Sequence, residues 1–128
     1  MAKRVVLTSK APKPVARYSQ GIVCNGFVFV AGQGPVDVGT GKLIESNDIR
    51  DQTRATLDNI KAILEAAGSS MDKVVKVSVF LKHLEEFPAM NEVYMQYFKA
   101  DPPPVRTTVG TSLLGGRMNI EIDCIAEA

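Results

Sequence analysis

Residues 21–31 read GIVCNGFVFVA and contain the clearest hairpin signal in the chain. Two short β segments, residues 21–24 and 27–31, are joined by Asn25-Gly26. Asparagine and glycine both tolerate the positive φ angles that a two-residue hairpin turn requires. We therefore predict an antiparallel hairpin here and place the other elements around it.

The segments after this hairpin predict a loop and then a long helix. Residues 32–41 carry four glycines and Pro35, which predicts a loop with tight turns. Residues 48–67 repeat apolar side chains at helical spacing, with N-cap candidates at 46–48 and a terminating Gly68. The repeated positions are Ile49, Leu57, Ile60, Leu64 and Ala67.

The second half of the chain predicts a strand, a helix and two further strands. Residues 73–82 alternate as a strand with Val75, Val77, Val79 and Leu81 on one face and Lys76, Ser78, Phe80 and Lys82 on the other. A helix follows Pro88, with Met90, Tyr94, Tyr97 and Phe98 at helical spacing, and the prolines at 102–104 end it. Residues 105–109 and 118–126 alternate as strands. The order predicts one α+β domain over residues 1–128, with helices on one sheet face.

Composition limits the classes of function. The 128 residues carry a formal net charge of +1, which does not favour nucleic acid as a partner. One histidine and two cysteines cannot build a cysteine-histidine zinc site, and we expect no metal and free thiols in a reducing compartment. No signal segment or membrane-spanning run is visible, so we expect a cytoplasmic protein with no membrane partner.

Three apparent motifs carry no chemistry. Gly39-Thr40-Gly41-Lys42 resembles a phosphate loop, but Val36 and Leu43 stand where that motif needs glycine and a hydroxyl residue. His83 lies at a strand-to-helix junction without the signature of a catalytic relay, so we interpret it as a solvated side chain. Cys24 and Cys124 lie on the apolar side of their strands, which favours core packing over nucleophilic chemistry.

One charged constellation remains at the end of the chain. Alternation in residues 105–109 predicts Val105, Thr107 and Val109 toward the core, with Arg106 and Thr108 on the other face. Residues 120–126 place Glu121 and Asp123 on their non-core face in the same way. These charges are either a cross-strand ion pair on a solvated surface or part of a site, and periodicity leaves both open.

The chain resembles the reactive-intermediate deaminases, the RidA-like or YjgF-type family. The resemblance extends over nearly the whole chain and rests on an ordered series of segments. These are Ala11-Pro12, Arg17-Tyr18-Ser19-Gln20, Val30-Ala31-Gly32-Gln33, Asp58-Asn59-Ile60, Glu65-Ala66-Ala67-Gly68, Val74-Val75-Lys76-Val77-Ser78-Val79-Phe80, Met90-Asn91-Glu92-Val93-Tyr94, Val105-Arg106-Thr107 and Ile120-Glu121-Ile122.

The resemblance implies a chorismate-mutase-like fold assembled as a homotrimer with clefts between subunits. It also implies hydrolysis of enamines and imines, such as 2-aminoacrylate, to 2-oxo acids and ammonia without a cofactor. Arg106 would bind the substrate carboxylate, and Glu121 would accept a hydrogen bond from the attacking water and assist its deprotonation. These two positions match the family arginine and glutamate. Tyr18, Gly32, Asn91 and Thr108 would bind substrate. The expected partners are small imino and 2-oxo acids.

Departures from the family pattern bear on the substrate range. Many members have serine at the position of Ala31 and cysteine at that of Thr108, and residues 113–117 differ from the usual Leu-Pro-Lys pattern. Tyr18 and Asn91 also have plain structural interpretations, as a half-buried aromatic residue and a helix-surface amide. Two other functions stay open: a metabolite-binding or holdase trimer, and an RNA-cleaving enzyme.

Overall fold

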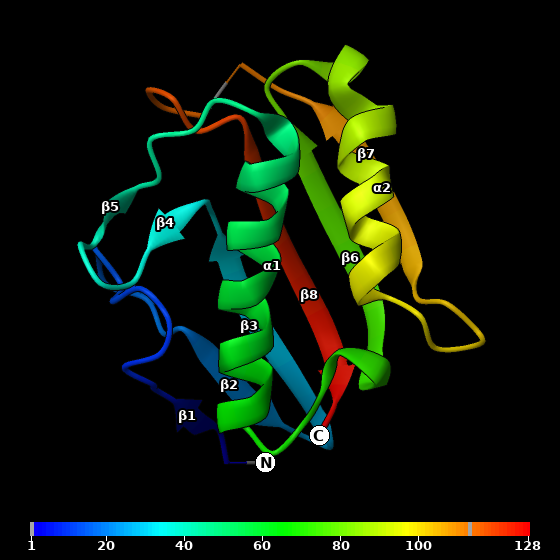
Figure 1. Ribbon diagram of the computed structural model, residues 1–128. Helices are drawn as coiled ribbons and strands as arrows, with labels where there is room; N and C mark the ends of the chain where they lie inside the picture. The colour runs from blue at the N-terminus through cyan, green and yellow to red at the C-terminus, as the bar shows by residue number, and fades with distance from the viewer. Residues whose placement is uncertain (1, 113) are drawn as a thin grey trace.

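A computed structural model describes residues 2–112 and 114–128 of the chain. The main sheet has six strands in the order β1-β2-β3-β8-β6-β7. Two helices, α1 and α2, lie side by side across one face of this sheet (Figure 1). The predicted α+β class, with both helices on one face, is therefore confirmed.

The strands of the main sheet pair antiparallel, except that β6 and β7 are parallel. They are β1 (Arg4–Val6), β2 (Gly21–Cys24), β3 (Phe27–Gln33), β6 (Val74–Leu81), β7 (Val105–Gly110) and β8 (Ile120–Glu127). The helices are α1 (Ile49–Ala66) and α2 (Phe87–Tyr97), with short 3₁₀ turns η1 (Met71–Lys73) and η2 (Leu84–Glu86). The predicted loop at 32–41 is wrong in part. It contains β4 (Val36–Asp37), which pairs with β5 (Lys42–Leu43) in a small separate hairpin.

The predicted hairpin and the first helix are confirmed. Asn25 and Gly26 have φ angles of 53° and 82°, as a tight turn between β2 and β3 requires. Helix α1 begins after Asp48, whose carboxylate accepts a hydrogen bond of 2.8 Å from the Arg50 amide. It ends at Ala66, and Gly68, just beyond the C-cap, has a φ angle of +84°, at which glycine is favoured.

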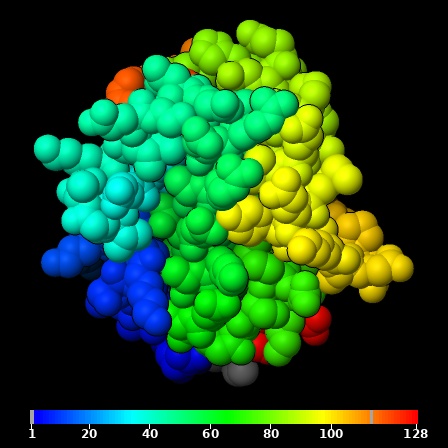
Figure 2. Space-filling model, in the orientation of Figure 1, coloured from blue at the N-terminus to red at the C-terminus, as the bar shows by residue number. Residues whose placement is uncertain are grey.

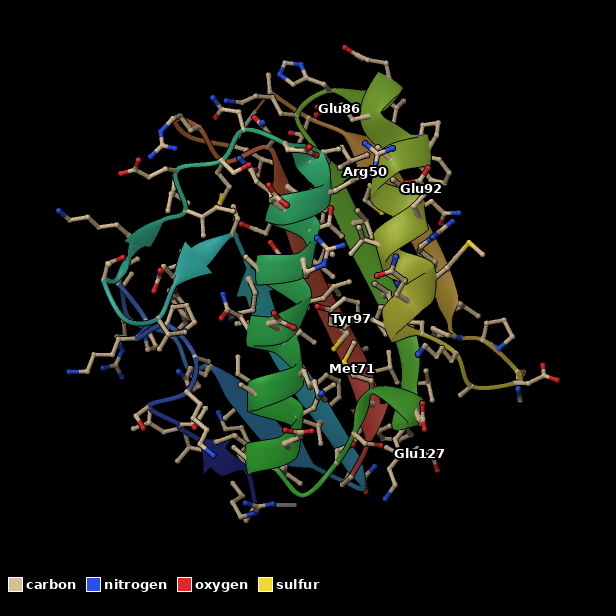
Figure 3. All side chains as sticks on the ribbon, viewed as in Figure 1. Arg50, Met71, Glu86, Glu92, Tyr97 and Glu127 are labelled. Atoms are coloured by element: carbon tan, nitrogen blue, oxygen red, sulfur yellow. The ribbon has the colours of Figure 1, made fainter. Side chains whose placement is uncertain are left out.

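The core lies between the two helices and the sheet. Leu57, Ile60 and Leu64 of α1 are completely buried against it. Figure 2 shows that α1, α2 and the segment after α1 cover most of this side of the molecule. On the outer surface Arg50 of α1 and Glu92 of α2 point toward each other and form a 2.8 Å ion pair (Figure 3).

The opposite face of the sheet carries no helix, and several large apolar side chains are exposed on it. They are Val5, Phe27, Phe29, Val75, Val105 and Val109. Two predictions are wrong here. A register shift between Val74 and Lys76 turns Val75 outward and buries Val74 instead. Cys24 lies opposite Phe27 and is half-buried on this open face, whereas Cys124 is buried in the core as predicted.

A buried amide fixes the N-terminal segment to the sheet. Gln20 is 1% exposed, and its Nε2 donates to the carbonyls of Thr8, Ala11 and Pro12 at 2.9–3.3 Å. Its Oε1 accepts from the Thr8 amide at 2.7 Å. Its own carbonyl accepts from the Ala31 amide in β3. Residues 8–12 are therefore held against the start of the hairpin.

Replacing Gln20 tests this network. Gln20→Met keeps the side-chain volume but leaves four backbone groups without their partner, so we expect it to lower the free energy of unfolding by about 2–3 kcal/mol. Urea denaturation measures the loss. Gln96→Met, at an exposed position of α2, is the matched control and changes stability by less than about 0.5 kcal/mol. Equal stability of the two variants would refute the assigned role.

Candidate functional site

The predicted orientation of β7 is wrong. Arg106 pairs with Val77 and Thr108 with Val79, and both valines are completely buried under the helices. Paired residues of neighbouring strands point to the same face of a sheet. Arg106 and Thr108 therefore face the helix layer, and Val105, Thr107 and Val109 face the open side. The alternation was detected correctly, but its faces were assigned in reverse because β7 is an edge strand with neither face fully covered.

The Arg106 guanidinium is held by helix α2. Its Nη1 donates a 2.6 Å hydrogen bond to Oδ1 of Asn91. Its Cζ lies 4.5 Å from the ring centroid of Tyr94 and 5.2 Å from that of Phe87. Among the described residues, the ion pairs involve Arg50 and Arg54 and not Arg106. The cation thus contacts aromatic faces and one amide oxygen, and no carboxylate neutralises it.

Two of these contacts escaped the sequence analysis. Phe87, Asn91 and Tyr94 are spaced by four and three residues, so a helix beginning near Pro88 places them on one face. Tyr94 was used only to predict the helix from its spacing, and Phe87 was not considered. The spacing from Asn91, a predicted site residue, is the signal that could have found both.

The Thr108 hydroxyl lies on the same face of β7 as Arg106. Its Oγ1 is buried and makes no hydrogen bond to any residue that the structure describes. A buried hydroxyl without a partner is costly, and it can donate or accept once a ligand reaches it. Thr108 stays a candidate substrate contact beside Arg106.

Glu121 lies on the other face of the sheet. It alternates in β8 with Ile120 and Ile122, which are completely buried on the helix side. A Cβ atom on Gly32 would lie 2.6 Å from Oε2 of Glu121, so only glycine leaves room for the carboxylate there. Burial raises the pKa of Glu121, and the nearby Asp123 raises it further.

Tyr18 and Gly32 share a cavity with Glu121. The cavity has a volume of about 370 Å³ and extends between β3, β8 and the segment that Gln20 fixes. Tyr18 is 48% exposed at its edge, and Val15 and Met118 supply apolar walls. This cavity therefore holds a carboxylate with a raised pKa, a phenol and an apolar lining.

Arg106 and Asn91 line a different cavity. It has a volume of about 400 Å³, and Tyr94, Pro103 and Pro104 contribute to it. Strand β6 separates β7 from β8, and the two charged side chains point to opposite faces. The cross-strand ion pair considered from the sequence is therefore excluded. One chain thus presents two candidate half-sites on opposite faces of the sheet, one around the Arg106 guanidinium and one around the Glu121 carboxylate.

The structure gives no sign of catalysis at His83 and Cys124, for which the sequence predicted no catalytic role. His83 is exposed just before η2. Burial raises the pKa of the Cys124 thiol to about 12, which disfavours a thiolate. No group of three or more potential metal-binding side chains occurs in the part of the chain that the structure describes. In the same part, no helix is both long and apolar enough to cross a membrane.

Two of the departures from the family pattern can be located. Ala31 donates its amide to the Gln20 carbonyl, next to Gly32. In the segment 113–117, Leu113 lies outside the described residues. Arg117 donates to the carbonyls of Ile44 and Glu45 at 2.9 and 3.1 Å, so this segment is tied to the loop before α1.

Comparison with known proteins agrees with the resemblance seen in the sequence. The family model described as Endoribonuclease L-PSP matches residues 8–128. A RutC family protein of Pyrococcus abyssi is 50% identical over 126 residues, covering 98% of each chain. A 2-iminobutanoate/2-iminopropanoate deaminase of Dermatophagoides farinae is 37% identical over 123 residues, covering 96% of this chain and 94% of the relative.

A solved structure gives the same result. The crystal structure of a member of the conserved Rid protein family from Yersinia pestis superposes with a TM-score of 0.94 at 40% identity, covering 99% of this chain and 100% of that one. The fold and the sequence thus agree over almost the full length of the chain. This chain belongs to the Rid family of proteins, the family whose model is described as Endoribonuclease L-PSP.

Proposed function

We propose that this protein is a homotrimeric hydrolase that converts short 2-imino acids, and the enamines that tautomerise to them, into 2-oxo acids and ammonia. The observation that carries the proposal is the Arg106 guanidinium, which lacks an acidic partner among the described residues and lines an open cavity. A relative that bears the name 2-iminobutanoate/2-iminopropanoate deaminase supports the same reaction.

Arg106 binds the substrate carboxylate. Its Nη1 donates to Asn91, and the planar guanidinium carries further N–H groups that can make a two-point contact with a carboxylate. The aromatic rings of Tyr94 and Phe87 exclude water from its faces. A small anion bound there is oriented through its carboxylate.

Glu121 acts as the general base and then as the general acid. As a carboxylate it accepts a proton from the water while the water oxygen bonds to the imine carbon. The C=N electron pair moves to nitrogen, which takes up a proton from solvent, and an amino alcohol forms. Glu121 then gives its proton to that nitrogen, the hydroxyl loses its proton to solvent as the C=O bond forms, and the C–N bond breaks to release ammonia and the 2-oxo acid. Tyr18 stands in the same cavity and can donate a hydrogen bond to the substrate or the water. No cofactor takes part in these steps.

A second copy of the chain completes the site. The half-sites of one chain face opposite sides of the sheet, so Arg106 and Glu121 of the same chain cannot act on one substrate. The open face carries exposed apolar side chains, among them Phe29 and Val109, that burial against another copy would stabilise. Closed cyclic assembly brings Arg106 of one copy near Glu121 of the next.

Substitution of Arg106 is the first test. With the imine supplied by a threonine dehydratase and its decay followed by competition with semicarbazide, we expect Arg106→Ala to lower kcat/KM by about 100- to 1,000-fold. Arg106→Lys keeps the charge but loses the planar fork, and we expect a loss of about 10- to 100-fold. Arg50→Ala, which removes an ion pair on the outer surface, is the control and leaves activity unchanged. No acceleration by the wild-type protein would rule out the proposed reaction.

The pH dependence tests the role of Glu121. Because its pKa is raised, the carboxylate form is lost as pH falls through a value above the ordinary glutamate pKa of about 4.3. We therefore expect kcat/KM to fall on that acid limb. Glu121→Gln lowers kcat by about 100- to 10,000-fold and abolishes the limb. Asp123→Asn removes the second cause of the shift, so the limb moves to lower pH. If the acid limb of kcat/KM lies at the same pH in Asp123→Asn as in the wild-type protein, the limb does not report the ionisation of Glu121.

Mixing variants tests the shared site. Arg106→Ala and Glu121→Gln chains are inactive separately, but one supplies an intact Glu121 and the other an intact Arg106. When they are unfolded together and refolded in equal amounts, about a quarter of the sites regain both groups, so activity rises to about a quarter of the wild-type value. The same chains refolded apart and mixed briefly serve as the control. If the co-refolded sample is no more active than the control mixture, the site lies within one chain.

A further inference from the structure

Tyr94 is the residue most closely associated with the Arg106 guanidinium. It is 7% exposed, and its ring centroid lies 4.5 Å from the Arg106 Cζ, closer than the 5.2 Å of Phe87. Burial raises the pKa of the Tyr94 hydroxyl, although the charge of Arg106 and its hydrogen bonding to that hydroxyl oppose the rise, so the phenol stays neutral at physiological pH. A neutral aromatic face attracts the cation without neutralising it.

Arginine without such a contact samples many rotamers. Its long side chain loses conformational entropy when it is fixed, and binding a ligand has to offset that cost unless the protein fixes the side chain beforehand. Asn91 fixes one nitrogen of the guanidinium but leaves rotation about that hydrogen bond open. A ring beneath the guanidinium removes this remaining rotation.

We infer that Tyr94 is a positioning residue for the substrate carboxylate, which it orients through Arg106 without touching the reacting atoms. The inference rests on the proposed function for the identity of the ligand. It assigns a purpose to the aromatic ring and not to the hydroxyl, and it predicts that phenylalanine can replace tyrosine at this position.

The experiment compares Tyr94→Leu, Tyr94→Phe and Tyr97→Leu. Tyr97 lies on the same helix, and its hydroxyl donates 2.7 Å to Asp58 of α1, so Tyr97→Leu removes the same kind of side chain away from Arg106. Each variant is assayed for kcat and KM, and the binding of 2-oxobutanoate and of its uncharged amide is measured by calorimetry. The thermal midpoint of each variant reports its stability.

We expect Tyr94→Leu to raise KM and the Kd of 2-oxobutanoate by about 5- to 20-fold and to change kcat by less than about threefold, because a carboxylate contact is lost equally in the ground and transition states. Binding of the amide is unchanged. Tyr94→Phe keeps KM, kcat and the Kd of 2-oxobutanoate within about twofold of the wild-type values. Tyr97→Leu lowers the thermal midpoint but leaves both constants at wild-type values.

A spectroscopic signature separates positioning from general destabilisation. We expect the ring current of Tyr94 to shift the NMR resonance of the Arg106 Nε–H proton in the wild-type protein. The shift persists in Tyr94→Phe and Tyr97→Leu and is reduced in Tyr94→Leu, where only the Phe87 ring remains. This measurement does not depend on catalysis. If Tyr94→Leu does not fold, Phe87→Leu takes its place, with a smaller change of the same sign in KM and Kd.

The outcomes distinguish this inference from the proposed function. A wild-type protein that binds 2-oxobutanoate but does not accelerate imine decay refutes the deaminase proposal while the binding data still test Tyr94. Equal increases in Kd for Tyr94→Leu and Tyr97→Leu, an unchanged Arg106 resonance in Tyr94→Leu, or no binding of 2-oxobutanoate by any variant would overturn the positioning role.

Discussion

The register between β6 and β7 is the constraint from which the arrangement of the site follows. Because Arg106 pairs with the buried Val77, its side chain must enter the helix layer, where α2 supplies an amide and two aromatic rings. Glu121 alternates with buried isoleucines in β8 and must therefore leave on the opposite face. A shift of one residue in β7 would turn Arg106 away from α2, and a shift of one residue in β8 would turn Glu121 away from its cavity, so each shift would destroy one half-site.

This separation has an electrostatic consequence. An arginine and a glutamate in contact within one chain would form a salt bridge, which would occupy the guanidinium and lower the pKa of the carboxylate. With the sheet between them, Arg106 keeps its charge available for an anion, and Glu121 keeps a pKa that burial and Asp123 raise. In the proposed assembly the two groups of different copies meet with a substrate between them.

The surrounding structure supports each half-site separately. Gln20 holds residues 8–12 beside the cavity of Glu121, and the absence of a side chain at Gly32 makes room for the carboxylate. On the other side, the spacing of Phe87, Asn91 and Tyr94 along α2 presents three contacts to one guanidinium. Residues three and four positions apart lie on one face of a helix, and this spacing is why the three side chains reach the same guanidinium.

The sequence by itself determined the hairpin at Asn25-Gly26, the limits of α1, the helix after Pro88 and the identity of the charged residues, because these depend on local backbone preferences and helical spacing. It did not determine which face of β7 is buried. Val105, Thr107 and Val109 form the more apolar face, but the burial of an edge strand is set by what packs on it. The outward turn of Val75 and the half-buried position of Cys24 also depend on register with neighbouring strands. Only the tertiary structure decided these features, because strand pairing joins residues far apart in the chain, and no local pattern encodes the partner.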